Sequence, residues 1–172
     1  MTTDFLLEPG TNGFIGSSPP ITLLSTELNA LTSGGAVTST VGGTAGVFTQ
    51  TNTGSAPQGG IWYKNTLATP LYTPAAGAYL AGWFLLSGDG GTTFETPVTS
   101  PSTTVPALAR APDFIIPMAN QALVLNAAFW CQGRFVGLPW ESFKVLLQNM
   151  SGATMSATLN AIVLGPTALH YN

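Results

Sequence analysis

The sequence predicts an all-β protein: an antiparallel β-sandwich, jelly-roll-like, with an extended N-terminal arm and one short helix. Short runs of alternating apolar residues, turn signals rich in Gly and Pro between them, and a single helix-start pattern lead to this prediction. About eight strands at short spacing are typical of sandwiches and jelly rolls. A chain of 172 residues suits one domain, which we place at residues 25–172, after an arm at residues 1–24.

The arm is predicted from the Pro and Gly residues of the N-terminal segment. Pro and Gly recur so often in residues 1–24 that neither a helix nor a long strand fits. Large apolar side chains would be wasted on a free tail, and the arm carries five of them: Phe5, Leu6, Leu7, Phe14 and Ile15. We expect either an arm that docks through these residues or a partly disordered terminus.

One helix is predicted directly after the arm. Ser25 is a good N-cap for a short helix over Thr26–Leu31, and Glu27 falls in the first turn, where a negative charge favours the helix dipole. Gly34 and Gly35 would end this helix.

The first half of the β domain alternates strands with wide turns. Residues 32–60 are rich in Gly, Thr and Ser but contain enough Val and Phe for several weak strands. Ile61–Thr66 has strand character, and Tyr79–Leu86 is apolar on both faces, which indicates a central strand or one at an interface. The turn Ser87–Gly91 predicts a hairpin, with Thr92–Glu95 as its return.

The second half contains four further strands. Arg110–Pro117 includes a short strand bracketed by prolines, and apolar residues alternate along Leu123–Cys131. In Phe143–Gln148, Phe143, Val145 and Leu147 face one way while Lys144 and Gln148 face the other. The inner face of the last strand is predicted from four alternating residues: Ala157, Leu159, Ala161 and Val163.

Charged residues are scarce. Lys, Arg, Asp and Glu make up 6% of the chain, where about 25% is usual. Thr, Ser, Asn and Gln must therefore supply the polar surface, which suits a protein packed against other subunits better than a free enzyme. Four basic residues and a net charge of −3 also argue against nucleic-acid binding and against a polybasic membrane anchor.

Candidate catalytic and metal-binding residues are few. Cys131 is a single cysteine in an apolar run, and His170 near the chain end is a single histidine, so a Cys–His site has little support. Asp89 and Glu95 flank the hairpin as a conceivable calcium or glycosidase pair, without a recognisable motif around them. We expect no enzyme activity, no cofactor and no metal.

Two binding hypotheses remain. Arg110 and Asp113 are three residues apart and are predicted to form a local ion pair that fixes a loop, with a possible role at a subunit contact. Trp62 and Trp140 are the aromatic residues best placed for exposure, and such rings stack on sugars. Core and interface packing is the interpretation that we favour for the tryptophans, because sugar sites also need polar partners.

Several segments together resemble small structural proteins of tailed-bacteriophage virions, of the capsid decoration or head-stabilising type. The resemblance is carried by Leu24–Leu31, by Tyr79–Leu86 with its Gly-Asp-Gly-Gly turn and Phe94-Glu95, by Arg110–Pro117, and by Leu138-Pro139 with Phe143–Asn149. These segments cover about half of the chain and contain no catalytic signature.

The resemblance implies a β-rich subunit that binds the major capsid protein on the capsid surface of the virion and forms a homo-oligomer, for which a trimer is one option. The arm residues would then contact neighbouring capsid subunits. The N-terminus has no signal-peptide pattern and no stretch long enough for a bilayer span, so we expect synthesis in the host cytoplasm and no membrane partner. The alternatives are a carbohydrate- or receptor-binding module of a phage tail or fibre, and a tail-tube or baseplate subunit.

Overall fold

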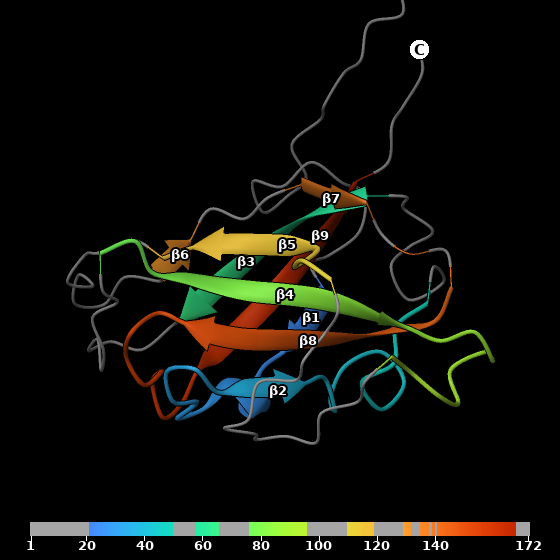
Figure 1. Cartoon of the computed structure of the whole chain (residues 1–172), viewed down its shortest axis with the longest axis horizontal. Coiled ribbons are helices and arrows are strands. Elements are labelled where there is room, and N and C mark those ends of the chain that lie inside the picture. Colours follow the sequence, from blue (N-terminus) through green and yellow to red (C-terminus); the bar gives the residue numbers. More distant parts are fainter. Residues whose placement is uncertain are drawn as a thin grey trace, which may run out of the picture.

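The computed structural model of the chain describes residues 21–49, 58–65, 76–95, 110–118, 129–131, 135–137, 139 and 141–167. These residues form nine strands and one 3₁₀ helix: β1 (Ile21–Leu24), η1 (Thr26–Leu28), β2 (Ala36–Thr38), β3 (Gln58–Asn65), β4 (Tyr79–Leu86), β5 (Phe114–Pro117), β6 (Phe129–Cys131), β7 (Phe135–Gly137), β8 (Phe143–Met150) and β9 (Asn160–Thr167). The prediction of an all-β protein with very little helix is confirmed (Figure 1).

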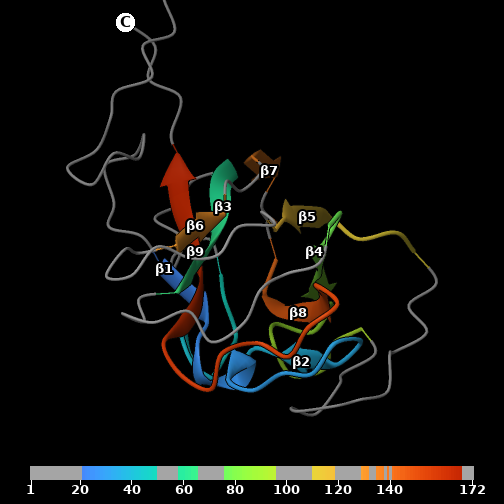
Figure 2. The same cartoon turned by 90° about the vertical axis from the view of Figure 1, so that its left-hand side faces the viewer.

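The strands form two antiparallel sheets. One has the order β1-β9-β3-β6, with β7 also paired to β3, and the other has the order β2-β8-β4-β5. Figure 2 shows the two sheets as neighbouring layers. With β7 set aside, the pairing is nested: β1 pairs with β9, β2 with β8, β3 with β6, and β4 with β5. The first described strand therefore pairs with the last, and the strands between them pair successively inward.

One buried cluster takes side chains from both sheets. Tyr63 and Ile162 come from the five-stranded sheet, and Phe84 and Phe143 come from the four-stranded sheet. The rings of Phe84 and Phe143 meet edge to face with centroids 5.1 Å apart, an arrangement that aromatic pairs prefer. Each large apolar side chain buried in this way contributes about 1.5–3 kcal/mol, so contact between the inner faces stabilises both sheets.

The strand Tyr79–Leu86 has the predicted bounds and lies between β8 and β5. Leu80 and Phe84 enter the main core, while Ala81, Trp83 and Leu85 lie in a second buried cluster on the opposite face. The prediction of a central strand that is apolar on both faces is thus confirmed. The alternation predicted for Phe143–Gln148 is confirmed as well, because Phe143, Val145 and Leu147 are all core residues.

The predicted helix over Thr26–Leu31 is wrong in length and type. It is a 3₁₀ helix of three residues, and the Ser25 side chain makes no capping hydrogen bond. The Glu27 carboxylate binds the backbone N–H groups of Thr40 and Val41 in the loop after β2. Asn29 is already extended, so the chain leaves the helix after one turn.

The predicted inner face of the last strand is wrong by one residue. β9 begins at Asn160, and its core residues are Ile162 and Leu164. Leu159, which the alternation places on the inner face, is 54% exposed and has a φ of 61°. Asn160 is buried because its Oδ1 accepts a hydrogen bond from the Tyr63 hydroxyl at 2.8 Å, and a shift of one residue turns every side chain of a strand to the other face.

Two further boundaries differ from the prediction. Residues 21–24, expected at the end of the arm, form β1 and pair with β9, whereas residues 1–20, with all five predicted anchors, lie outside the described residues. Residues 92–95 do not form a return strand after the turn at Ser87–Gly91. The chain nevertheless comes back to β4, because the Glu95 N–H donates to the Leu86 carbonyl oxygen at 3.1 Å.

Candidate functional site

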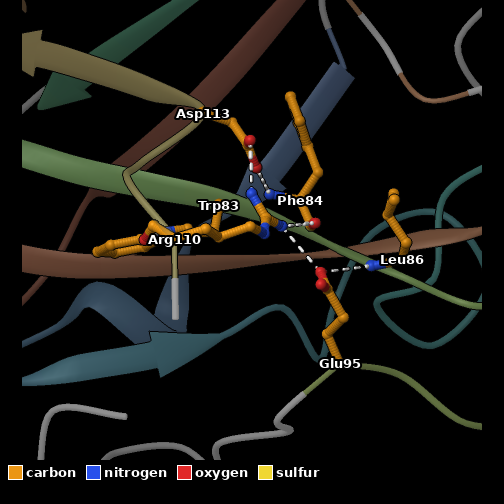
Figure 3. A network of polar contacts seen from close by, with 6 residues as sticks. All are labelled: Trp83, Phe84, Leu86, Glu95, Arg110 and Asp113. Atoms are coloured by element: carbon orange, nitrogen blue, oxygen red, sulfur yellow. Dashed lines mark hydrogen bonds and ion pairs between the residues drawn. The ribbon is translucent and has the colours of Figure 1, made fainter. Parts of the chain in front are cut away.

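Charged side chains gather where β5 leaves the edge of β4. The ladder between the two strands covers only Tyr79–Gly82 of β4. The next backbone groups along the same edge belong to Phe84 and Leu86, and unpaired groups on a strand edge are prone to pair with other chains. Figure 3 shows that Arg110, Asp113 and Glu95 bind these groups.

Arg110 and Asp113 together satisfy both backbone groups of Phe84. Arg110 Nη2 donates to the Phe84 carbonyl oxygen at 2.7 Å, and Asp113 Oδ2 accepts the Phe84 N–H at 2.7 Å. The two side chains are also paired with each other, Nη1 to Oδ1, at 2.6 Å. The predicted local ion pair is confirmed, and its atoms replace the strand that is missing at this position.

Glu95 extends the network to Leu86. Its Oε2 accepts a hydrogen bond from Arg110 Nη2 at 2.8 Å and lies 3.5 Å from the Leu86 N–H. The hydrogen bond that Arg110 donates lowers the pKa of the Glu95 carboxyl, and the hydrogen bonds that Arg110 donates to Asp113 and Glu95 raise the pKa of its guanidinium. The Glu95 carboxylate and the Arg110 guanidinium therefore stay charged at neutral pH. Sequence reasoning missed Glu95 here, because it is 15 residues from Arg110 along the chain.

Glu27 fixes the loop after β2 through its carboxylate. Its Oε1 accepts hydrogen bonds from the N–H groups of Thr40 and Val41 and from the Thr40 hydroxyl, all at 2.8–2.9 Å. Its Oε2 accepts the Ser25 N–H at 2.9 Å. Burial raises the pKa of the Glu27 carboxyl, but the backbone hydrogen bonds outweigh burial and bring the pKa below its ordinary value of 4.5.

Asp89 organises the turn after β4. Its Oδ1 accepts the N–H groups of Thr92 and Thr93 at 3.0 and 2.8 Å, and its Oδ2 accepts the Thr93 hydroxyl at 2.7 Å. These bonds from Thr93, with another from the Ser87 hydroxyl, hold the pKa of the Asp89 carboxyl well below its ordinary range. Asp89 and Glu95, weighed as a joint site, thus serve different parts of the backbone.

Most of the described carboxylates bind the backbone of the chain itself. Glu27, Asp89, Glu95 and Asp113 all accept backbone N–H groups, and within the described residues only Glu141 remains outside this pattern as an exposed side chain. A carboxylate saturated by backbone donors is a poor general base, because its pKa falls away from neutrality. In these parts of the chain, no three His, Cys, Asp or Glu residues gather in a way that could hold a metal ion.

A groove without charged residues lies on the five-stranded sheet beside η1. Its volume is about 320 Å³, and it is lined by side chains from β1, η1 and β9 and their flanks: Thr22, Ser25, Thr26, Asn29, Leu159, Asn160, Ala161 and Val163. Trp62, a candidate for sugar stacking under the alternative interpretation, stands opposite Val163 in the register of β3 and β9. Trp140, the other one, and His170 lie outside the described residues, and Cys131 ends β6.

Comparison with known proteins identifies no relative. Neither the protein-family models, nor the curated proteins, nor the solved structures gave a match to this chain. The described part of the chain has no helix with the length and hydropathy of a membrane span.

Proposed function

We propose that this chain is a structural virion protein that binds the outside of a bacteriophage capsid lattice and stabilises it. The observation that carries the proposal is the use of the charges: four of the five described carboxylates, and Arg110, hold the chain's own backbone. Contacts with neighbouring subunits would then depend on neutral polar and apolar groups. A surface with few free charges provides little electrostatic repulsion between molecules in solution, but a subunit that is packed in a lattice needs little of it.

The nested pairing supports a jelly-roll-like sandwich as the finer description of the fold. Pairing the first strand with the last, and each following strand with its counterpart, is what winding one ribbon into two sheets produces. Jelly rolls of eight strands occur in viral capsid domains and in lectin domains. The fold is thus compatible with a lattice subunit, while function has to be argued from the surfaces.

One end of the described molecule offers a contact surface of the expected kind. The loops at residues 39–48 and 87–95 adjoin, since a Cβ on Gly91 would stand 3.4 Å from a methyl carbon of Val47. Val41 in the first loop is 53% exposed, and Leu86, which leads into the second, is 41% exposed. The first loop carries no carboxylate of its own, and Asp89 and Glu95 of the second are engaged by backbone N–H groups and by Arg110, which leaves apolar groups for a neighbour.

The segment before β1 would serve as the arm of this proposal. Its apolar residues Phe5, Leu6, Leu7, Phe14 and Ile15 would dock on adjacent copies of the major capsid protein. Apolar burial contributes about 25 cal/mol per Å², and many copies on one shell turn weak single contacts into firm attachment. Self-association around a local symmetry axis would place Arg110 and Asp113 near a subunit contact.

The test compares particles with and without the protein. Particles of the source bacteriophage that lack this chain should lose their DNA at lower temperature and after milder osmotic shock, and adding the purified chain should restore resistance. A chain that lacks residues 1–20 should restore less than the full chain at equal concentration. Unchanged integrity of the depleted particles would overturn the proposal.

A carbohydrate- or receptor-binding module is the second candidate, favoured by the uncharged groove and by the occurrence of jelly rolls among lectins. For this function, glycan binding should be lost when Trp62 or Trp140 is replaced by Ala, while particle stability should not depend on the chain.

A further inference from the structure

The groove on the five-stranded sheet is lined by apolar side chains together with uncharged polar ones. Leu159, Ala161 and Val163 supply apolar surface, and the remaining lining residues carry hydroxyl or carboxamide groups. A volume of about 320 Å³ lies at the lower end of the range for small-molecule sites, about 300–1,000 Å³. Since all eight lining residues are uncharged, the groove selects against a ligand that needs a counter-ion.

Three hydroxyl groups of the groove are available to a ligand. Ser25 occupies the N-cap position of η1 but makes no capping hydrogen bond. Within the described structure, the hydroxyls of Thr22, Ser25 and Thr26 make no hydrogen bond to the chain. Hydroxyl groups both donate and accept, so they match a ligand that itself carries hydroxyl groups.

Asn29 is held in place from the core. The buried Asn160 donates from Nδ2 to the Asn29 Oδ1 at 2.9 Å and to the Ser156 carbonyl oxygen at 2.7 Å. Its own Oδ1 accepts the Tyr63 hydroxyl at 2.8 Å. This chain of bonds fixes the Asn29 carboxamide with its oxygen toward Asn160, which leaves its NH₂ group as a preorganised donor at the groove.

We propose that this groove is a binding site for a neutral carbohydrate. Sugars present apolar C–H faces and a ring of hydroxyl groups, which correspond to the apolar side chains and to the hydroxyl and carboxamide groups of the lining. The groove lies on a different sheet from the Arg110 network, and the proposal holds whether the chain sits on a capsid or on a tail.

The position of Trp62 supports the same site. Trp62 stands directly opposite Val163 of the groove in the β3–β9 ladder, and directly opposed residues are nearest neighbours across strands. Trp62 is also one of the two residues that the sequence offers for stacking on a sugar, as the alternative to core and interface packing. The register brings it to the strand next to the groove.

Saturation-transfer NMR of the full chain tests the site. The probes are the methyl glycosides of glucose, galactose and mannose, and N-acetylglucosamine, with glucuronic acid as the charged comparator. Ala161→Leu should fill the groove and abolish the transfer signal, and Thr26→Val should weaken binding by about two- to tenfold through loss of one hydroxyl. Thr32→Val, which removes an exposed hydroxyl outside the groove, should bind like the original chain.

A thermal melt of each variant shows that it is folded before it is compared. Saturation transfer from at least one neutral sugar that Ala161→Leu removes and Thr32→Val retains supports the site. Absence of transfer from every neutral sugar, transfer that survives in both groove variants, or transfer from glucuronic acid alone would overturn it. None of these results depends on particle stability, so the virion proposal is judged separately.

Discussion

Arg110 donates a hydrogen bond from Nη2 to the carbonyl oxygen of Phe84 at 2.7 Å, at a position on the edge of β4 that a paired strand would otherwise fill. The same guanidinium binds Asp113, which accepts the N–H of Phe84. The ion pair thus makes the two backbone hydrogen bonds that one residue of a paired strand would make. Arg110, one of only four basic residues in the chain, thus has a structural role.

Arg110→Ala should destabilise the fold by about 1–2 kcal/mol, because the Phe84 carbonyl and the Asp113 and Glu95 carboxylates lose their donor. The low figure reflects side chains that are about one-third exposed, where water replaces part of the loss. The stability of Arg110→Lys should fall between that of Arg110→Ala and that of the original chain, since an ammonium group cannot reproduce the forked hydrogen bonds of the guanidinium. Urea unfolding measures the difference.

Glu141→Gln is the matched control for this series, because Glu141 is exposed and lies outside the network. Its free energy of unfolding should stay within about 0.5 kcal/mol of the original chain. An Arg110→Ala variant as stable as Glu141→Gln would show that the network is not structural.

Glu27→Gln should destabilise the chain by about 1–3 kcal/mol at pH 7, because an amide cannot accept all four hydrogen bonds of the carboxylate. The effect should depend on pH. The pKa of Glu27 is lowered in the folded state, so its contribution is present above the ordinary value of 4.5 and is lost as pH falls through the folded pKa.

Unfolding free energies of the original chain and of Glu27→Gln should therefore converge as the pH falls below 4.5. Measurements from neutral pH down to well below the ordinary pKa of Glu27, at constant ionic strength, follow this convergence. A gap that is constant over the whole range would contradict the role of the ionised carboxylate.

The parts of this fold that follow from short-range patterns could be predicted. Apolar residues on both faces of Tyr79–Leu86 identify a strand that has to be covered on both sides, and alternation along Phe143–Gln148 identifies the face of that strand that enters the core. The Arg110–Asp113 pair was within reach of the sequence because its members are only three residues apart.

The parts that depend on distant partners could not be predicted. Glu27 looks like a first-turn helix residue until the loop after β2 is placed beside it, and Glu95 joins Arg110 only through the path of β4 and β5. The inner face of the last strand was predicted wrongly because Asn160 is polar, and the sequence alone does not show that its hydrogen bond with Tyr63 allows it to be buried. Pattern reasoning failed where a polar side chain binds groups that are distant from it in the sequence.

Gly82→Ala should destabilise the chain by about 1–3 kcal/mol through overpacking. A Cβ at Gly82 would overlap the ring of Phe114, which is buried against it on β5. Combining the change with Phe114→Leu should recover part of the loss, which a double-mutant cycle by urea unfolding measures.

Gly88→Ala is the control, because a Cβ there meets no atom within 4 Å and the residue has no positive φ. It should be neutral within about 0.5 kcal/mol. Equal effects of Gly82→Ala and Gly88→Ala would show that the contact between Gly82 and Phe114 is not tight.

Val41→Lys and Leu86→Lys should weaken attachment to particles without unfolding the chain. Both side chains are substantially exposed at the end that we propose as a contact, so a new charge costs little in solution but must lose its water in a neutral interface. Co-sedimentation with particles that lack the chain should show at least a tenfold loss of affinity. Thr32→Lys, at another exposed position, should bind normally, and equal binding by all three variants would place the contact elsewhere.

The most direct test of the central claim is electron microscopy of purified particles of the source bacteriophage, with this chain located in the density. The account predicts that the chain lies on the outer shell, with neutral surfaces against its neighbours and residues 1–20 reaching adjacent capsid subunits. Density for the chain in the tail or at a fibre tip, or its absence from the particles, would contradict the account.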